Sequence, residues 1–264
     1  MTTPIVSVSV VSHLQANMVK SLLFDIELHC RSVPLELILT LNLPEALPFD
    51  ASSFSFPVRL LKNGAALGFS ANHNQAFNLS SGQYFCVLNP DIRLHNDPFP
   101  VLLSGLRDPG VGVVAPLVLG PDGTLEDSVR HFPSPLKIVC KLLGRCKGSD
   151  YVVGDAPVRP DWAAGMFLMF PRAIFEKLNG FDQRYFLYYE DVDICARLKL
   201  LGKDVLVCPH AKVVHRAHRG SHRQLRYLRW HLASMLHFFL SSVYLRLLWR
   251  KCLQWHPTHQ HSPK

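Results

Sequence analysis

Three acidic residues follow a group of aromatic residues in the segment 180–197. Glu190, Asp191 and Asp193 come directly after this group, and a helical pattern begins at these acids. Acids in a first helical turn are stabilised by the partial positive charge of the unpaired N–H groups there. A carboxylate beside apolar rings is also desolvated, which raises its pKa toward the range of a general base. The segment therefore predicts either a general base at a catalytic site or a capped helix start with solvated acids.

Another acid comes directly after a predicted strand. The apolar run Tyr84–Leu88 is followed by Asn89, Pro90 and Asp91. In open α/β sheets, ligands bind outside the carboxyl ends of the strands, and a hard divalent cation prefers oxygen ligands. Asp91 is therefore a candidate ligand of a divalent cation, although Asn, Pro and Asp also favour an ordinary turn.

A glycine-containing stretch precedes a predicted helix. Residues 63–74 read Asn-Gly-Ala-Ala-Leu-Gly-Phe-Ser-Ala-Asn-His-Asn, and the helical pattern continues to Leu79. Small residues let the backbone approach a ligand closely, and a turn at a helix start can hold a phosphate or a sugar. Turns of this composition also occur for steric reasons alone.

The elements that must position these residues alternate along the chain. A strand–helix–strand unit at the start predicts a parallel strand pair with a right-handed crossover. The alternation predicts an α/β fold with a mixed, mostly parallel central sheet flanked by helices. Residues 120–123 predict a hairpin that returns through Leu125, and the proline-rich residues 131–160 predict a surface excursion. Strands are predicted at 5–11, 35–41, 58–62, 84–88, 111–119, 164–170, 205–208 and 212–215, and further helices at 18–30, 98–107, 171–178 and 190–201.

Charge is distributed unevenly along the chain. The 264 residues are 48% hydrophobic and 18% charged, which suits one large globular domain, or one domain with an appendage. Residues 197–264 hold thirteen Lys and Arg and one acid, Asp204, so this end carries +12 and residues 1–196 carry −4 of the net +8. A mildly acidic body with a basic end predicts an anionic partner for that end.

Cysteine usage and the N-terminus bear on the compartment. Seven cysteines without C-x-x-C spacing predict buried thiols in a reducing compartment rather than disulfides or a zinc site. The N-terminus has neither the basic nor the apolar region of a signal peptide. Both features predict a cytoplasmic location.

The basic end has a helical pattern of its own. Apolar residues recur at near-helical spacing from His222 to Trp255, and arginines that include Arg219 and Arg223 line an opposing face. The uninterrupted apolar stretches fall short of the ~20 residues that a membrane span needs. The pattern predicts a basic amphipathic helix on an anionic membrane, at the inner face of the plasma membrane. A helix packed on its own domain, or on a second copy in a homodimer, fits the same pattern. We therefore divide the chain into a domain of residues 1–220 and a helical tail of residues 221–264.

Taken in order, the motifs resemble the inverting family 2 glycosyltransferases of the GT-A fold, and among them the bacterial rhamnosyltransferase-like branch. The resemblance spans most of residues 5–221. The segments that carry it are Val6–Ser12, 63–74, Leu-Asn-Pro-Asp at 88–91, Gly-Met-Phe-Leu-Met at 165–169, 180–193 and Pro-His-Ala-Lys-Val-Val-His at 209–215.

The resemblance implies roles for individual side chains. Asp191, with Glu190 beside it, would be the catalytic base, and Asp91 would bind Mg²⁺ or Mn²⁺ against the donor diphosphate. His215 would lie near this metal, although a lone histidine is also often structural. The donor-binding residues would be Ser12, Asn42, Asn63, Gly68, Asn72, Asn74, Asn89, Asp91 and Gly165.

The chain departs from the family pattern at two of these positions. Asn89 stands in place of the first acid of the metal motif, so this site offers the metal one carboxylate fewer than a two-acid site. Asn42 stands where the family usually has an acid that holds the nucleobase, so the identity of the base is open.

The predicted function is an inverting glycosyltransferase. It would move a sugar, rhamnose being one candidate, from a nucleoside-diphosphate donor to a hydroxyl of a saccharide or lipid-linked acceptor in cell-surface polysaccharide synthesis. Two alternatives are a non-catalytic nucleotide-sugar-binding protein and a nucleic-acid-binding protein that uses the basic end. Nucleic acid binding leaves the acidic body and the strand-end acids unexplained, so no nucleic acid partner is expected.

Overall fold

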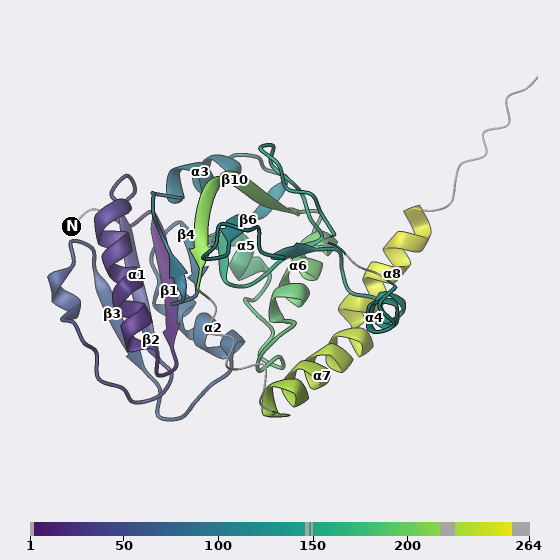
Figure 1. Ribbon diagram of the computed structural model, residues 1–264, viewed down its shortest axis with the longest axis horizontal. Coiled ribbons are helices and arrows are strands. Elements are labelled where there is room, and N and C mark those ends of the chain that lie inside the picture. The colour runs from purple at the N-terminus through teal and green to yellow at the C-terminus, as the bar shows by residue number, and fades with distance from the viewer. Residues whose placement is uncertain (1–2, 146–147, 149, 217–224, 255–264) are drawn as a thin grey trace, which may run out of the picture.

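An eight-stranded sheet runs through the molecule, with helices on both of its faces (Figure 1). The computed structural model describes residues 3–145, 148, 150–216 and 225–254. The order of the strands is β3-β2-β1-β4-β9-β6-β10-β5, and β7 pairs with β8 in a separate small sheet. The strands are β1 (Val6–Ser12), β2 (Leu35–Leu41), β3 (Val58–Lys62), β4 (Tyr84–Leu88), β5 (Ile92–Arg93), β6 (Val111–Leu119), β7 (Val129–Arg130), β8 (Trp162–Ala163), β9 (Phe167–Pro171) and β10 (Asp204–His215).

The sheet is mixed and mostly parallel, as predicted. β1 pairs in parallel with both β2 and β4, β2 pairs in parallel with β3, and β10 pairs in parallel with β6. Within the described sheet, β9 and β5 run antiparallel to the strands that they pair with. The carboxyl ends of β1, β2 and β4 therefore meet at one edge of the sheet, where ligands bind in open α/β proteins.

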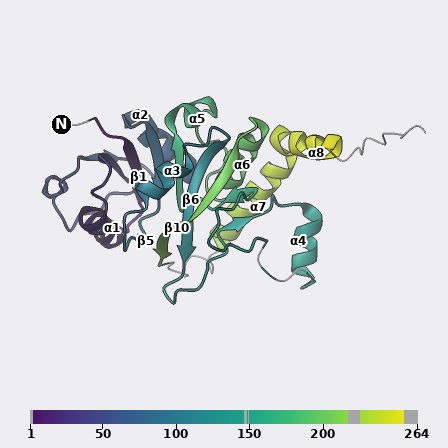
Figure 2. The same ribbon diagram turned by 90° about the horizontal axis from the view of Figure 1, so that it is seen from above.

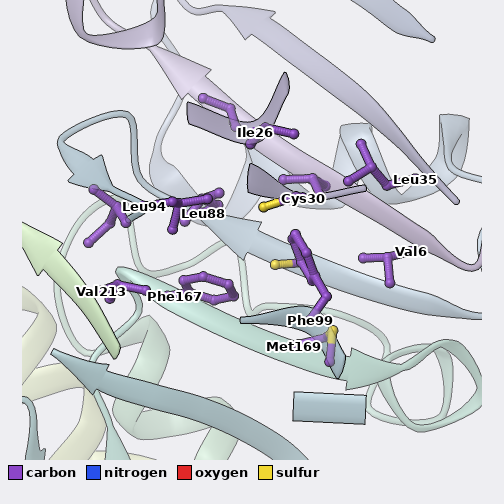
Figure 3. Packing of buried hydrophobic residues seen from close by; sticks show 14 of the residues in the cluster. Val6, Ile26, Cys30, Leu35, Leu88, Leu94, Phe99, Phe167, Met169 and Val213 are labelled. Carbon is purple, nitrogen blue, oxygen red and sulfur yellow. The ribbon is translucent and has the colours of Figure 1, made fainter. Parts of the chain in front are cut away.

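Each face of the sheet is covered by its own helices. Buried side chains of α1 and α3 join one hydrophobic cluster, and those of α2, α5 and α6 join a second on the opposite face. Figure 3 shows part of the first cluster, including Ile26 of α1, Phe99 of α3 and Phe167 of β9. The helices are α1 (Ala16–His29), α2 (Phe69–Leu79), α3 (Phe99–Gly105), α4 (Pro135–Leu142), α5 (Arg172–Lys177), α6 (Glu190–Leu200), α7 (Leu225–Leu240) and α8 (Ser242–Gln254), with a 3₁₀ turn at Ala51–Ser53.

Side-chain alternation explains why the strands serve both clusters. In β4, Phe85 and Val87 face the second cluster, whereas Cys86 and Leu88 face the first. Successive side chains of a strand point to opposite faces, so a continuous apolar run suits a strand that is covered on both sides.

Two sequence predictions about elements were wrong, and a third missed a helix. The two strands predicted at 205–208 and 212–215 are one strand, β10, whose pairing with β6 shifts register between Cys208 and Lys212. The strand predicted at 164–170 begins only at Phe167. The proline-rich excursion contains a helix, α4, because Pro135 at its first position is compatible with helical geometry.

The basic end forms two helices rather than the single helix that was predicted. α7 and α8 are bent by 51° relative to each other at Ser241 and pack on α6. Figures 1 and 2 both place α4, α7 and α8 at the end of the molecule away from the N-terminus. In the described part of the chain, no single helix is long and apolar enough to cross a membrane, whereas the bent pair α7–α8 meets that criterion by length and composition. The predicted boundary at 220, Arg219, Arg223 and residues 255–264 lie outside the described residues.

Candidate active site

A strained turn places the acids at the start of α6. Tyr188 and Tyr189, the two residues before the helix, have φ angles of 69° and 67°, in the left-handed region. A residue other than glycine held there costs about 1–3 kcal/mol, and such strain is concentrated at functional sites. Tyr189 is buried against α7 and α8. The packing of the two C-terminal helices therefore supports the backbone that presents Glu190 and Asp191.

Asp191 accepts two backbone hydrogen bonds. The N–H of Gly165 donates to its Oδ2 at 3.0 Å, and the N–H of Val192 donates to its Oδ1 at 2.8 Å. Burial raises the pKa of the Asp191 carboxyl, whereas these two N–H groups and the charge of Arg130 oppose the rise. The site thus combines a desolvated carboxylate with donors that stabilise its charged form, which are the properties of a general base.

Glu190 has a different environment. Its side chain is buried, and its Oε2 atom has no hydrogen-bond partner among the described residues. Burial, together with the charge of neighbouring Asp191, raises the pKa of Glu190 well above its ordinary value. Where the environments of two neighbouring acids differ in this way, their roles differ too. Burial thus favours the neutral form of Glu190, whereas the two N–H donors favour the charged form of Asp191.

Asp193 has a structural role. Its carboxylate is buried and accepts a hydrogen bond from Arg197 Nε at 2.7 Å, and Arg197 Nη1 donates to the carbonyl of Leu178. One alternative for this acidic segment was a capped helix start with solvated acids. Asp193 is instead buried in an i,i+4 ion pair within α6, and its partner Arg197 connects α6 to the end of α5.

Asp91 and His215, the two predicted metal ligands, lie together. β10 ends antiparallel to β5, with His215 opposite Ile92, and this pairing places the imidazole beside Asp91. His215 Nε2 lies 3.2 Å from Asp91 Oδ2, and His215 Nδ1 lies 2.8 Å from Glu126 Oε2. Burial alone would lower the pKa of His215, but the hydrogen bonds and charges of the two carboxylates raise it to about 9. The sequence did not point to Glu126, because no motif or spacing connects it to a residue 89 positions away.

The two acid sites are joined through the segment before β9. The N–H of Asn89 donates to the carbonyl of Met166 at 2.9 Å, while the neighbouring Gly165 donates to Asp191. Asn89 in turn lies two positions before Asp91. Because β9 lies beside β4 in the sheet, one short backbone segment separates the predicted metal ligand from the predicted base.

A cavity of about 690 Å³ opens at the carboxyl ends of β1, β2 and β4, and we call it the strand-end cavity. One part of its wall is polar, and the other is aromatic and basic. The predicted residues that line it are Asn42, Gly68, Asn72, Asn89 and Asp91. The sequence missed the residues that α7 contributes, which are Arg226, Tyr227 and Trp230.

Three of the predicted donor-binding asparagines form one network. Asn63 Nδ2 donates to Asn42 Oδ1 at 2.9 Å and to Asn72 Oδ1 at 2.7 Å. The Asn42 amide also bonds both the N–H and the carbonyl of Leu67. The network therefore fixes the loop before α2. At the end of this loop, a Cβ on Gly68 would approach the carbonyl oxygen of Phe186 to 2.5 Å, so only glycine fits there.

The remaining residues that were predicted to bind the sugar donor make contacts within the protein. Ser12 is buried, and its Oγ accepts the N–H of Gln15 at 3.2 Å. Asn74 bonds both the N–H and the carbonyl of Phe181, and it lines a different cavity. Gly165 holds Asp191. Each of these side chains or backbone groups thus makes a contact within the protein, and its contact with the sugar donor stays a prediction.

A divalent cation is compatible with the Asp91 site. Across the described residues, no three His, Cys, Asp or Glu side chains are clustered as a metal site. Asp91 Oδ1, however, is buried and has no hydrogen-bond partner among those residues. One carboxylate oxygen beside an imidazole suits a cation that takes its other ligands from phosphate and water.

The fold is that of the GT-A glycosyltransferases. The structure is similar to the crystal structure of GalNAc-T7 with UDP, GalNAc and Mn²⁺, with a TM-score of 0.62 and 15% identity over 81% of this chain and 44% of that one. At this identity the similarity concerns the fold alone.

The sequence identifies the family. The family described as glycosyl transferase family 2 matches residues 43–194, more than half of the chain, and the chain belongs to that family. It is 30% identical to rhamnosyltransferase WbbL of Escherichia coli over 67% of this chain and 71% of that protein. It is also 30% identical to N-acetylglucosaminyl-diphospho-decaprenol L-rhamnosyltransferase of Mycobacterium tuberculosis over 75% of this chain and 71% of that protein. The protein is therefore an enzyme, a rhamnosyltransferase-like glycosyltransferase, and neither alternative function is favoured.

Proposed function

We propose that the enzyme transfers a hexosyl group, with inversion, from a nucleoside-diphosphate sugar to a hydroxyl of a saccharide acceptor, with Asp191 as the base. The observation that carries this proposal is the difference between Glu190 and Asp191. A partly exposed carboxylate held by two N–H donors stands next to a buried acid whose pKa is raised well above its ordinary value by burial.

In the proposed reaction, the acceptor oxygen forms a bond to the anomeric carbon from the side opposite the leaving group. The bond from that carbon to the phosphate oxygen breaks, and its electron pair leaves with the nucleoside diphosphate. Asp191 takes the proton of the acceptor hydroxyl and later releases it to water. A positioned general base typically contributes ~10²–10⁴-fold in rate.

Asp91 and His215 would hold the divalent cation, Mg²⁺ or Mn²⁺. When bound, it would neutralise charge that develops on the diphosphate. This chain's own contribution is to leave the buried Asp91 Oδ1 without a hydrogen-bond partner among the described residues and to fix the other carboxylate oxygen through His215. Binding of the cation would displace the proton that His215 carries, because a ligating imidazole is neutral.

The similar proteins support a choice of substrates. Both relatives are named as rhamnosyltransferases, and the mycobacterial name includes a lipid-linked sugar diphosphate. We propose a deoxyhexosyl donor of the rhamnose type and a lipid-linked saccharide acceptor used to build a cell-surface polysaccharide.

We further propose that α7 and α8 lie on an anionic membrane surface. Leucines along both helices are exposed, among them Leu232, Leu236 and Leu245, and Trp249 is 68% exposed. Residues 225–254 include five Lys and Arg and no Asp or Glu. Exposed apolar side chains interspersed with basic ones suit a helix that lies in the interface of an anionic bilayer.

A binding panel tests the proposed donor. Nucleotide sugars, each with Mg²⁺ or Mn²⁺, would be screened by thermal shift, since a ligand of the native state raises the melting temperature. Calorimetry on the best ligand would then compare wild type, Asp91→Asn and the control Asp108→Asn, a surface position outside the cavity. We expect binding that depends on metal in wild type and in the control. Equal affinity with chelator, or in Asp91→Asn, would contradict the metal role.

Co-sedimentation tests the proposed membrane surface. Wild type should bind vesicles that contain anionic phospholipid and bind zwitterionic vesicles weakly. The double change Leu232→Asp with Leu236→Asp should abolish binding, whereas the control Leu28→Asp, an exposed leucine of α1, should not. Binding that is insensitive to anionic lipid, or to the double change, would contradict the proposal.

A further inference from the structure

The strand-end cavity has two chemically different halves. The half at the strand ends presents Asn42, Asn89 and Asp91, and the half beneath α7 presents aromatic rings and a cation. α7 lies beyond residues 43–194, the range that matches the family, so the side chains of α7 come from outside the matched range. The second half therefore combines Phe186, from the matched residues, with side chains of α7 that lie outside them.

The aromatic half is held in place before any ligand arrives. The Trp230 ring lies 4.8 Å from the ring of Phe186 and 5.3 Å from that of Tyr227. Two groups anchor α7 on the same face of the helix. Ser234 Oγ donates to the carbonyl of Leu187 at 2.9 Å, and Phe238 is fully buried. Rings fixed in this way bind with a small loss of conformational freedom.

Ring surfaces of this kind suit a sugar. The face of an aromatic ring is electron-rich and attracts groups with partial positive charge at their edges, such as the C–H bonds of a pyranose. Trp and Tyr also carry an N–H or O–H that can bond sugar hydroxyls. An entirely apolar ligand would leave those polar groups without use.

Arg226 adds a requirement for negative charge. Its guanidinium lies 5.1 Å from the centre of the Tyr227 ring and 5.8 Å from that of Trp230. Arg226 is exposed, its Nη2 donates to the Tyr227 hydroxyl at 3.4 Å, and residues 225–254 contain no acid that could pair with it. An exposed guanidinium held against rings, with further N–H donors besides this one, suits a phosphate group.

We propose that Arg226, Tyr227 and Trp230, with Phe186, form the acceptor subsite, and that it takes a sugar joined to a phosphate or diphosphate. Trp230 and Phe186 would contact the sugar ring, and Arg226 would bind the phosphate. This inference deepens the proposed function and rests on it, since it names the acceptor class for the same site. The opposite face of α7 carries exposed Leu232 and Leu236, so a lipid attached to that phosphate would leave the subsite toward the proposed membrane surface.

Direct binding tests the subsite without need of a donor. The probes are N-acetylglucosamine diphosphate carrying a short alkyl chain, and the alkyl glycoside of the same sugar without phosphate. Calorimetry would compare wild type with Arg226→Gln, Trp230→Ala and Trp230→Phe. The control is Arg229→Gln, which removes an exposed cation of α7 that does not line the cavity.

We expect Arg226→Gln to weaken the diphosphate probe roughly tenfold or more and to leave the glycoside unchanged, because a charged hydrogen bond to phosphate is lost. Trp230→Ala should weaken both probes, and Trp230→Phe should restore most of the affinity for the glycoside. The control should match wild type. Equal loss of both probes in Arg226→Gln, or no loss in Trp230→Ala with an unchanged melting temperature, would overturn the proposal.

The phosphate of the donor is the other anion that Arg226 could bind. The affinity for the nucleotide sugar that the thermal-shift panel identifies separates the two cases. If Arg226 binds only the acceptor, Arg226→Gln should keep this affinity within about twofold of wild type. A tenfold loss of donor affinity in Arg226→Gln with an unchanged acceptor affinity would assign the residue to the donor. If wild type binds no nucleotide sugar, the proposed donor fails, while the acceptor measurements still decide this inference.

Discussion

Two acid sites, one that lines the strand-end cavity and one at the start of α6, use carboxylates in opposite ways. At the end of β4, Asp91 is compensated by an imidazole whose pKa is raised to about 9, which favours a charged pair. At the start of α6, Glu190 is buried beside Asp191, and its pKa is raised well above its ordinary value. Partners and solvent access decide which carboxylate is charged, and residue type alone does not.

The difference separates two chemical tasks. A carboxylate paired with a proton-bearing imidazole is ready to exchange that proton for a cation. A carboxylate with a raised pKa is ready to take a proton from a hydroxyl. If this comparison is right, substitutions at the two sites should change different measurements.

The largest effect is expected from Asp191→Asn, which preserves shape and removes basicity. Turnover should fall by ~10²–10⁴-fold, with the affinity for the donor unchanged. Steady-state transfer assays and donor calorimetry would check this. A variant with near-normal turnover would assign the base elsewhere.

A second change distinguishes Asp193 from its neighbours. Asp193→Asn would leave Arg197 without its buried partner, and breaking such a pair costs about 3–5 kcal/mol of unfolding free energy. Denaturant unfolding would measure the loss. The activity per folded molecule should stay close to that of wild type, and a specific loss of turnover at full folding would place Asp193 in the chemistry.

The pair at His215 predicts a pH dependence in the absence of metal. The folded-state pKa of about 9 exceeds the ordinary value of 6.5, so the stabilisation is fully present below about pH 6.5 and is lost as pH rises through about 9. The loss should reach up to about 3 kcal/mol. His215→Gln should flatten this part of the curve in chelator-treated protein. An unchanged slope would show that the imidazole is not charged in the folded state.

The smallest effect on activity is expected at Glu190, because burial and the charge of Asp191 raise the pKa of its side chain and favour the neutral form. Glu190→Gln should keep turnover within about tenfold of wild type. A carboxyl with a raised folded-state pKa contributes stability below its ordinary value of 4.5 and loses it as pH rises through the folded pKa. The variant should therefore gain stability over wild type as pH rises above 4.5. A variant that is destabilised at neutral pH would contradict the neutral assignment.

Local patterns predicted most of the sheet. β2, β3 and β4 have the predicted bounds, since short apolar runs between turn residues leave little choice of conformation. The patterns failed where local signals conflict with pairing. Pro209 separates two β-branched runs and predicted a break, yet the pairing with β6 continues across it with a shift of register.

The tail shows where a helical pattern is ambiguous. The same spacing fits a helix on lipid and a helix on its own domain. In the structure, α7 packs on its own domain through Ser234 and Phe238, while its leucines remain exposed. The membrane surface, the homodimer and the cytoplasmic location stay predictions.

By itself, the sequence determined the kinds of groups present at the strand ends: an acid after β4, two acids after an aromatic run, and a late histidine. Only the tertiary structure decided their partners. Glu126 meets His215, Gly165 meets Asp191, and Arg226 and Trp230 reach the cavity across contacts between residues far apart in the chain. The physical reason is that short-range periodicity fixes local backbone geometry, whereas the charge of a carboxylate depends on burial and on neighbours that only folding brings together.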